Sequence, residues 1–396
     1  MVTHRLPVSP VLYARGLRGF ADGLVSVLLA GFLTGLGFSP LQVGAVVTGT
    51  LLGSAALTLG VGLAGRGWPL RSLLLAACAL MVLTGLGFAV ATTFPVVLLV
   101  AVVGTLNPSG GDVSVFLPTE QAQLADVLHA GERPRVYARY NLLGSVGAAV
   151  GALASGGFAP LADAAGWATT TADRLGFLLY AAIAGVVALL YRRLPRPAGT
   201  RGTAAATGPA AGRATEPGAA PGRAKPPVLG RARRTVLELA ALFSLDSAAS
   251  GFVVQSLLVL WLQLRFDMSS GAVGSVFFAA GLLGAASQLL APPLAARIGL
   301  VRTMVFTHLP ANALLAVAAF APSAGVAVAL LLTRALFAQM DVPARQSLVM
   351  AVVPPEERAA AASVTNVPRS LAAAATPLLA GALLAHTDVG WPLLVA

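Results

Sequence analysis

Four aspartates stand within long apolar stretches of the sequence, and the chemistry of a carboxylate in such a place needs an explanation. Asp22 lies in the run FADGLVSVLLAGFL at residues 20–33, Asp246 lies in LFSLDSAASG, and Asp112 and Asp341 occupy two other apolar stretches. A charged side chain at the centre of a bilayer costs about 3 kcal/mol or more, so an embedded carboxylate normally faces a watery pathway inside the protein. Such a group can take up and release a proton. We therefore predict that Asp22 and Asp246 carry proton coupling.

Asp22 also has a purely structural interpretation. At 1.5 Å per residue it lies roughly 15 Å into its helix, near the middle of a bilayer. Arg18 precedes it by one helical turn, and the two side chains can form a pair that only neutralises itself. Asp246 has no arginine within one turn.

The stretch TLNPSGGDVSVF at 105–116 is expected to interrupt its helix. Pro108 removes a backbone hydrogen bond, and the two glycines at 110–111 loosen the next turn. Broken helices in transporters expose backbone groups near the substrate, so Asn107 and Asp112, which flank the break, are candidate substrate contacts. The alternative is a kink that serves packing.

Two arginines lie inside apolar stretches as well. Arg334 and Arg369 either bind an anionic group of a substrate or pair with embedded acids, and we favour pairing. Asn141 and Asn366 complete the set of candidate substrate contacts. No site for a metal or another cofactor is expected, because the four histidines lack metal-ligand spacing; His308 and Asn312 share a helix face and suggest a buried packing pair.

The composition excludes a soluble protein. Hydrophobic residues make up 57% of the 396 residues, charged residues only 10%, and the mean hydropathy is +0.83. Soluble domains carry about 25% charged residues, so this chain is a polytopic membrane protein. The net charge of +11 does not indicate nucleic acid, because much of it belongs to one hydrophilic segment, and the single cysteine forms no internal disulfide.

Apolar stretches long enough to cross a bilayer predict eleven spans and the beginning of a twelfth at GWPLLVA, where we expect the chain to be truncated. The spans are expected at 12–37, 41–64, 70–91, 95–124, 136–158, 175–194, 234–263, 271–296, 300–321, 324–350 and 359–385.

Arginines gather in alternate loops, which places the N-terminus in the cytoplasm. The segment 195–232, rich in Pro, Gly, Ala and Arg, is expected to be a disordered cytoplasmic linker between an N-terminal half at 1–194 and a C-terminal half at 233–396. The bias towards Arg, Ala and Gly suggests a bacterial protein of the inner membrane, and we expect a monomer.

The two halves repeat each other. Pro118 and Pro343, Gln121 and Gln346, Arg133 and Arg358, Asn141 and Asn366, and Gly156 and Gly381 are each separated by 225 residues without a gap. These matches indicate a parallel repeat of two six-span halves.

Glu120 and Arg345 occupy equivalent positions of the repeat with opposite charges. We predict that they form a salt bridge across the halves that closes a cytoplasmic gate. Charged residues nearby or in the basic loops are assigned to the same gate: Asp341, Arg66, Arg71, Arg297 and Arg302.

With this organisation the sequence resembles the major facilitator superfamily. The loop after span two matches the family motif at Leu63, Ala64, Arg66 and Arg71, and the loop after span eight at Leu294, Ala295, Arg297 and Gly299. Both copies lack the Asp of the motif. The resemblance implies that spans 1, 4, 7 and 10 line a central cavity and that spans 3, 6, 9 and 12 face lipid. All four embedded aspartates lie on the cavity-lining spans.

We therefore expect a secondary transporter that works by alternating access and exports a small amphipathic or cationic organic compound in a proton-coupled manner. Uptake or uniport of a small organic anion is the alternative. A membrane sensor or scaffold that binds ligand without moving it is an alternative of another class. Nothing in the sequence points to an enzyme or to nucleic-acid binding.

Overall fold

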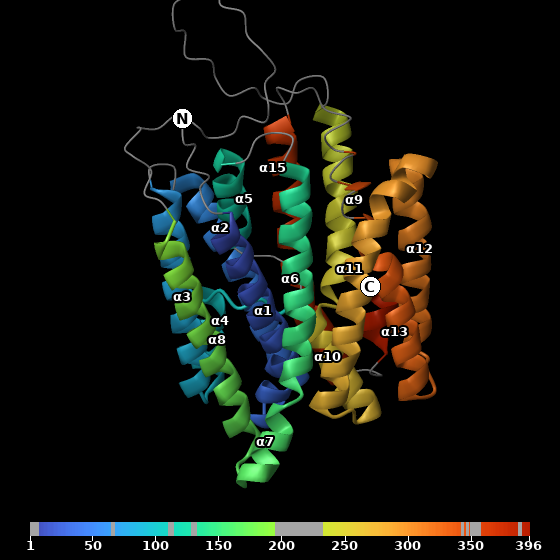
Figure 1. Ribbon diagram of the computed structural model, residues 1–396. Coiled ribbons are helices and arrows are strands. Elements are labelled where there is room, and N and C mark those ends of the chain that lie inside the picture. Colours follow the sequence, from blue (N-terminus) through green and yellow to red (C-terminus); the bar gives the residue numbers. More distant parts are fainter. Residues whose placement is uncertain are drawn as a thin grey trace, which may run out of the picture.

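The computed structural model is a bundle of long helices packed side by side (Figure 1). It describes residues 8–64, 68–109, 115–127, 133–194, 233–341, 344–345, 348, 358–386 and 390–396. All regular secondary structure within these residues is helical, which confirms the predicted all-α membrane fold.

Each half contributes its own set of helices. The N-terminal half consists of α1 (Ser9–Gly35), α2 (Pro40–Ala64), α3 (Leu70–Val90), α4 (Phe94–Val103), α5 (Phe116–Val127), α6 (Arg133–Ser155), α7 (Phe158–Ala165) and α8 (Thr169–Arg192). The C-terminal half consists of α9 (Arg233–Gly251), α10 (Gln255–Phe266), α11 (Ser270–Ile298), α12 (Leu300–Ala318), α13 (Ala324–Ala338), α15 (Arg358–His386) and α16 (Trp391–Val395).

In the described part of the chain, nine helical stretches are long and apolar enough to cross a bilayer. Two shorter apolar helices, α4 and α13, begin the predicted spans four and ten. The predicted interruption of span four is confirmed, because α4 ends at Val103 and α5 begins at Phe116. Two interruptions were not predicted: span seven is divided into α9 and α10 at residues 252–254, and α13 ends at Ala338 in a turn.

Helix α1 packs closely against α6, and small residues make this approach possible. A Cβ atom on Gly23 would lie 1.9 Å from the backbone oxygen of Ala148, and one on Gly151 would lie 1.9 Å from that of Phe20. Without a hydrophobic driving force in lipid, helix pairs are stabilised by this kind of close van der Waals contact. The pair therefore forms a rigid part of the N-terminal half.

The bundle has two ends. The linker end is the end at which α1, α6, α9, α12 and α15 begin, and the far end is the end at which α7 lies (Figure 1). Close contacts between the halves occur towards the far end. Gly44 near the start of α2 meets Gly381 of α15, and Gly274 near the start of α11 meets Ala152 of α6.

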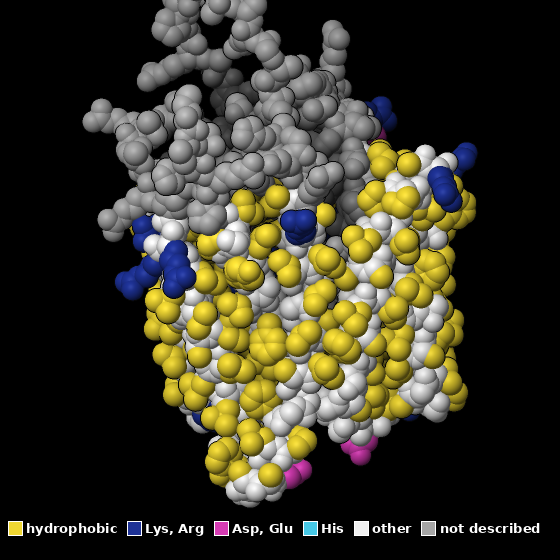
Figure 2. Space-filling model, viewed as in Figure 1, with side chains coloured by type: hydrophobic (Ala, Val, Ile, Leu, Met, Phe, Trp, Pro, Cys, Tyr) yellow, Lys and Arg dark blue, Asp and Glu magenta, His cyan; other side chains and the backbone are white. Residues whose placement is uncertain are grey.

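The outer surface suits a lipid environment. Hydrophobic side chains cover most of the described face in Figure 2, with arginines near the linker end and acidic groups at the far end. Leu83 of α3 is 64% exposed and Phe306 of α12 is 63% exposed. These helices are spans three and nine, which the family resemblance placed against lipid.

Candidate transport site

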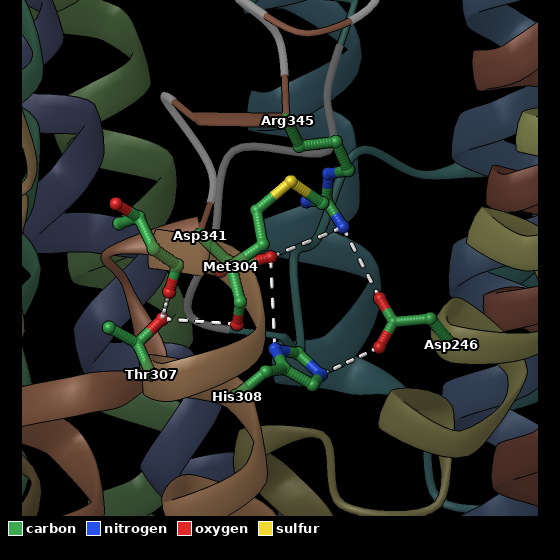
Figure 3. Close-up of polar contacts among 7 residues, drawn as sticks. Asp246, Met304, Thr307, His308, Asp341 and Arg345 are labelled. Carbon is green, nitrogen blue, oxygen red and sulfur yellow. Dashed lines mark hydrogen bonds and ion pairs between the residues drawn. The ribbon is translucent and has the colours of Figure 1, made fainter. Parts of the chain in front are cut away.

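A cluster of four titratable or charged side chains lies within the C-terminal half. Asp246 comes from α9, His308 from α12, and Asp341 and Arg345 from the segment that follows α13 (Figure 3). The Nε2 atom of His308 lies 2.7 Å from Oδ1 of Asp246, and its Nδ1 atom lies 3.9 Å from Oδ2 of Asp341. We call these four residues the proton cluster.

Arg345 joins the two carboxylates of the proton cluster on their other side. Its Nη1 atom lies 3.3 Å from Oδ2 of Asp246 and 3.4 Å from Oδ2 of Asp341. His308 is 31% exposed and Asp246 is 26% exposed, whereas Arg345 and Asp341 are 13% and 8% exposed. The imidazole edge of the cluster is therefore the part that water or a ligand reaches most easily.

Apolar packing positions the proton cluster from the linker-end side. Val236 and Phe243 of α9 form a small buried cluster with Met304 of α12 and Val364 of α15. Phe243 stands one turn before Asp246, and the guanidinium of Arg345 lies 5.7 Å from the centre of its ring. The helices that supply Asp246 and His308 are thus held together by side chains next to the site.

A second polar cluster lies in the N-terminal half around Glu120 of α5. Its carboxylate pairs with Arg18 of α1 and accepts hydrogen bonds from the hydroxyls of Tyr140 on α6 and Tyr191 on α8. The ring of Phe116 lies 4.2 Å from the guanidinium carbon of Arg18. Glu120 is fully buried and Arg18 is 1% exposed, so this group ties four helices together in the interior of one half.

The predicted gate pair between Glu120 and Arg345 is not formed in this structure, and its role as a cytoplasmic gate stays a prediction. Each residue is bound inside its own half, Glu120 by Arg18 and two tyrosines, and Arg345 by Asp246 and Asp341.

The two helix interruptions meet each other near Ser26 of α1. The backbone N–H and the hydroxyl of Ser256 both point to the backbone oxygen of Pro108, at 3.2 and 3.0 Å. The same hydroxyl lies 2.8 Å from the backbone oxygen of Ser26, and Gln255 donates to the Ser26 hydroxyl at 2.9 Å. This junction connects the two halves with polar groups that are removed from water.

Asn107 lies at this junction with 1% of its surface exposed, and its side-chain oxygen accepts from the N–H and hydroxyl of Ser109. Asp22 is 8% exposed on α1, one turn from Arg18, and it makes at least one polar or electrostatic contact. Tyr180 lies within electrostatic range of Asp22. Proton coupling by Asp22 stays a prediction.

Arg334 of α13 and Arg369 of α15 have buried Nε atoms with no hydrogen-bond partner among the described residues. The pairing with embedded acids that we favoured is not seen as an ion pair for either side chain in this part of the chain. Arg369 does lie within electrostatic range of Asp246 and Asp341.

The remaining predicted site residues lie away from both clusters or cannot be placed. Arg71 donates to the backbone oxygen of Arg192 at 2.7 Å, a contact within the N-terminal half, and Arg297, Arg302 and Asn141 are exposed. Arg66 and Asp112 lie outside the described residues, as does the side chain of Asn366. Their roles stay predictions.

Sequence reasoning missed His308, Tyr140 and Tyr191. His308 was assigned to packing because its only recognised neighbour was Asn312 on the same helix, whereas its contacts come from α9 and from the segment after α13. The described residues contain no group of histidine, cysteine and acidic side chains that could hold a metal ion.

Three comparisons with known proteins bear on this geometry. An uncharacterized membrane protein of Saccharomyces cerevisiae is 27% identical over 395 residues, which cover 95% of this chain and 87% of the relative. The crystal structure of a mutant of the nucleoside transporter NupG superposes with a TM-score of 0.72 at 12% identity, covering 98% of this chain and 95% of that chain. A bacterial homologue of the human lysosomal transporter Spinster, inward-facing and unoccupied, also gives 0.72, at 16% identity, with 95% and 81% covered.

At these identities the two solved structures show a shared fold and nothing finer. The expected bacterial source and truncation stay predictions. A family model described as Major Facilitator Superfamily matches residues 11–377. The match spans both halves, both polar clusters and the junction between the interrupted helices, and the chain therefore belongs to the Major Facilitator Superfamily.

Proposed function

We propose that the chain is a proton-coupled secondary transporter that moves a small organic compound by alternating access, with the proton cluster as its coupling site. The observation that supports this most strongly is the position of His308 between Asp246 and Asp341. A histidine is the side chain whose charge changes most readily near neutral pH.

One proton changes the bonding within the proton cluster. A neutral imidazole has one N–H and can donate to only one of the two carboxylates, whereas a charged imidazolium has two N–H groups and can face both. The shorter contact goes to Asp246 at 2.7 Å and the longer to Asp341 at 3.9 Å. Protonation therefore favours a closer approach of the segment after α13 to α12, which gives a proton a direct effect on helix positions.

The arrangement of the halves supports alternating access. The glycine contacts and the junction around Ser256 join the N-terminal and C-terminal halves towards the far end of the bundle. The arginine-rich linker end agrees with a cytoplasmic location of that end. We take the structure as an arrangement closed towards the outside, in which the halves separate at the junction when the protein opens outward.

The ion pairs made by the buried acids change which substrate charge we expect. A cationic or amphipathic export substrate was favoured because acidic groups dominate the cavity-lining spans. Asp246, Asp341 and Glu120 are already bound by arginine, histidine or tyrosine. A cation would have to displace these partners, so the alternative of an organic anion gains weight.

Ligand-induced thermal stabilisation of the purified protein tests the proposed function. A chemically broad library is screened at two pH values on either side of the normal histidine pKa, because a bound ligand raises the melting temperature by mass action. The change Asp246→Asn should remove the pH dependence of stabilisation by any hit. Asp163→Asn, an exposed position on α7, is the matched control and should leave it unchanged. Hits that stabilise wild type equally at both pH values would refute proton coupling.

A further inference from the structure

We propose that the substrate is a small organic anion, that Arg369 binds its anionic group, and that the anion and one proton are carried together in the same direction. This inference rests on the proposed function and deepens it by naming the substrate class and the coupling mode.

Arg369 belongs to a helix that lies at the seam between the halves. Helix α15 packs against α9 of its own half and against α2 of the other half, so it forms part of the seam between them. Leu378 of the same helix donates its N–H to the Thr48 hydroxyl of α2 at 2.9 Å. Arg369 is therefore carried on a helix that both halves contact, about two and a half turns before the hydrogen bond from Leu378 to Thr48.

The guanidinium of Arg369 has hydrogen-bonding capacity to spare. Its Nε atom is buried without a partner among the described residues. Burial of a charged donor without an acceptor is unfavourable, and a planar guanidinium matches carboxylate, phosphate and sulfonate groups with two parallel hydrogen bonds. The described structure thus leaves the Nε–H of Arg369 available to an anion.

The acids within electrostatic range of Arg369 already form ion pairs with other residues. Asp246 contacts both His308 and Arg345, and Asp341 contacts the same two residues. They lie within electrostatic range of Arg369 and keep its charge from being wholly uncompensated, yet neither forms an ion pair with it in the described part of the chain. An anionic ligand can bind Arg369 without displacing an existing pair.

The charges of this region give a reason for obligatory coupling. With a neutral imidazole, Asp246 and Asp341 balance Arg345 and Arg369, and the region is neutral. A proton alone makes it positive and an anion alone makes it negative, while both together restore neutrality. Because a net charge is costly in a low-dielectric interior, the states that cross between the two access modes are the empty one and the fully loaded one. Because only these two states cross, the anion and the proton move in the same direction.

Other titratable groups around His308 do not change the balance. Helix α12 packs against α13, α11 and α16. Arg334 is the charged residue of α13, Arg297 is exposed at the linker end of α11, and α16 carries no charge. Within the described part of the chain, Asp246, Asp341 and Arg345 lie within electrostatic range of His308.

A panel of permanently charged compounds tests the inference. Benzenesulfonate and methanesulfonate are compared with the neutral benzyl alcohol and glycerol and with the cation benzyltrimethylammonium. Benzenesulfonate and methanesulfonate stay ionised and do not themselves carry protons across a membrane. Thermal stabilisation is measured for wild type, Arg369→Gln, Arg369→Lys and the exposed control Arg234→Gln, and proton uptake on binding is followed with a pH indicator in weakly buffered solution.

Stabilisation of wild type by at least one anion, with uptake of about one proton per anion bound, is the expected result. Arg369→Gln should weaken anion affinity about tenfold or more, which corresponds to one lost charge-assisted hydrogen bond, while Arg369→Lys keeps part of it and Arg234→Gln keeps all of it.

Stabilisation by the neutral or cationic compounds with no response to any anion overturns the inference. If such a cation or neutral compound shows pH dependence that Asp246→Asn removes, the proposed proton coupling still stands. Anion binding that takes up no proton overturns both the inference and the proposed coupling. Failure of every anion to stabilise the wild type also overturns the inference.

Discussion

Removal of the Glu120 carboxylate should destabilise the protein strongly, because this group holds four helices together in the interior of the N-terminal half. Loss of one partner of a buried ion pair costs about 3–5 kcal/mol. The hydroxyls of Tyr140 and Tyr191 lose their acceptor as well, and both side chains are fully buried. We therefore expect about 4 kcal/mol or more for Glu120→Ala, or a fall in melting temperature of roughly 8 °C at about 2 °C per kcal/mol.

The single cysteine supplies the assay. Cys78 of α3 is 1% exposed and lies within electrostatic range of Arg18 and Glu120. A dye that fluoresces on reaction with thiols therefore reports the opening of this region on heating. Glu238→Ala is the control, because Glu238 is 62% exposed and forms an i,i+4 pair with Arg234 that is worth about 0.5 kcal/mol or less.

A melting temperature for Glu120→Ala within about 1 °C of wild type would show that the Glu120 carboxylate does not stabilise this half, since loss of a buried ion-pair partner costs several kcal/mol. The exchange of Glu120→Arg with Arg345→Glu gives a second check. The structure predicts that this double change is worse than either single change. Restored transport in the double variant would instead support a gate between the halves.

Three further changes test other parts of the structure. His308→Gln should abolish the dependence of ligand stabilisation on pH between about pH 5 and pH 8, and a surviving dependence would assign the proton elsewhere. Ser256→Ala removes hydrogen bonds at the junction, which should favour the outward-open population by about 1 kcal/mol, or about fivefold. Distances between spin labels placed across the far end measure this change of population. Gly23→Leu should prevent folding, because a Cβ atom there meets the backbone of Ala148, while Gly60→Ala, which meets nothing within 4 Å, should fold normally in expression tests.

The repeat explains what could be predicted around Glu120 and what could not. An offset of 225 residues predicts that Glu120 and Arg345 occupy equivalent positions. It does not reveal which residue each one contacts. In the structure, each completes a pair inside its own half: Glu120 on span four binds Arg18 on span one, and Arg345 on span ten binds Asp246 on span seven. Opposite charges at equivalent sites suggested one salt bridge across the halves. In the structure they belong to two equivalent ion pairs, one within each half, in which the acid and the base have exchanged places.

Backbone interruptions were predictable only where the sequence carries a strong breaking signal. Pro108 and the following glycines revealed the break in span four. The break at 252–254 is made of Phe252, Val253 and Val254, which no propensity rule excludes from a helix. It is stabilised by tertiary hydrogen bonds from Ser256 to Pro108 and Ser26. His308 was missed for the same reason, because its contacts come from segments distant in sequence.

Flux in proteoliposomes shows whether the proton cluster couples proton movement to transport. Protein is reconstituted with a pH-sensitive dye inside the vesicles, and an inward gradient of a compound that stabilises the wild type is imposed without an initial pH difference. We expect the wild type to acidify the vesicle interior as the compound enters, Asp246→Asn not to do so, and Asp163→Asn to behave as wild type. Entry of the compound through the wild type with no change of internal pH would show that the proton cluster does not couple the two movements.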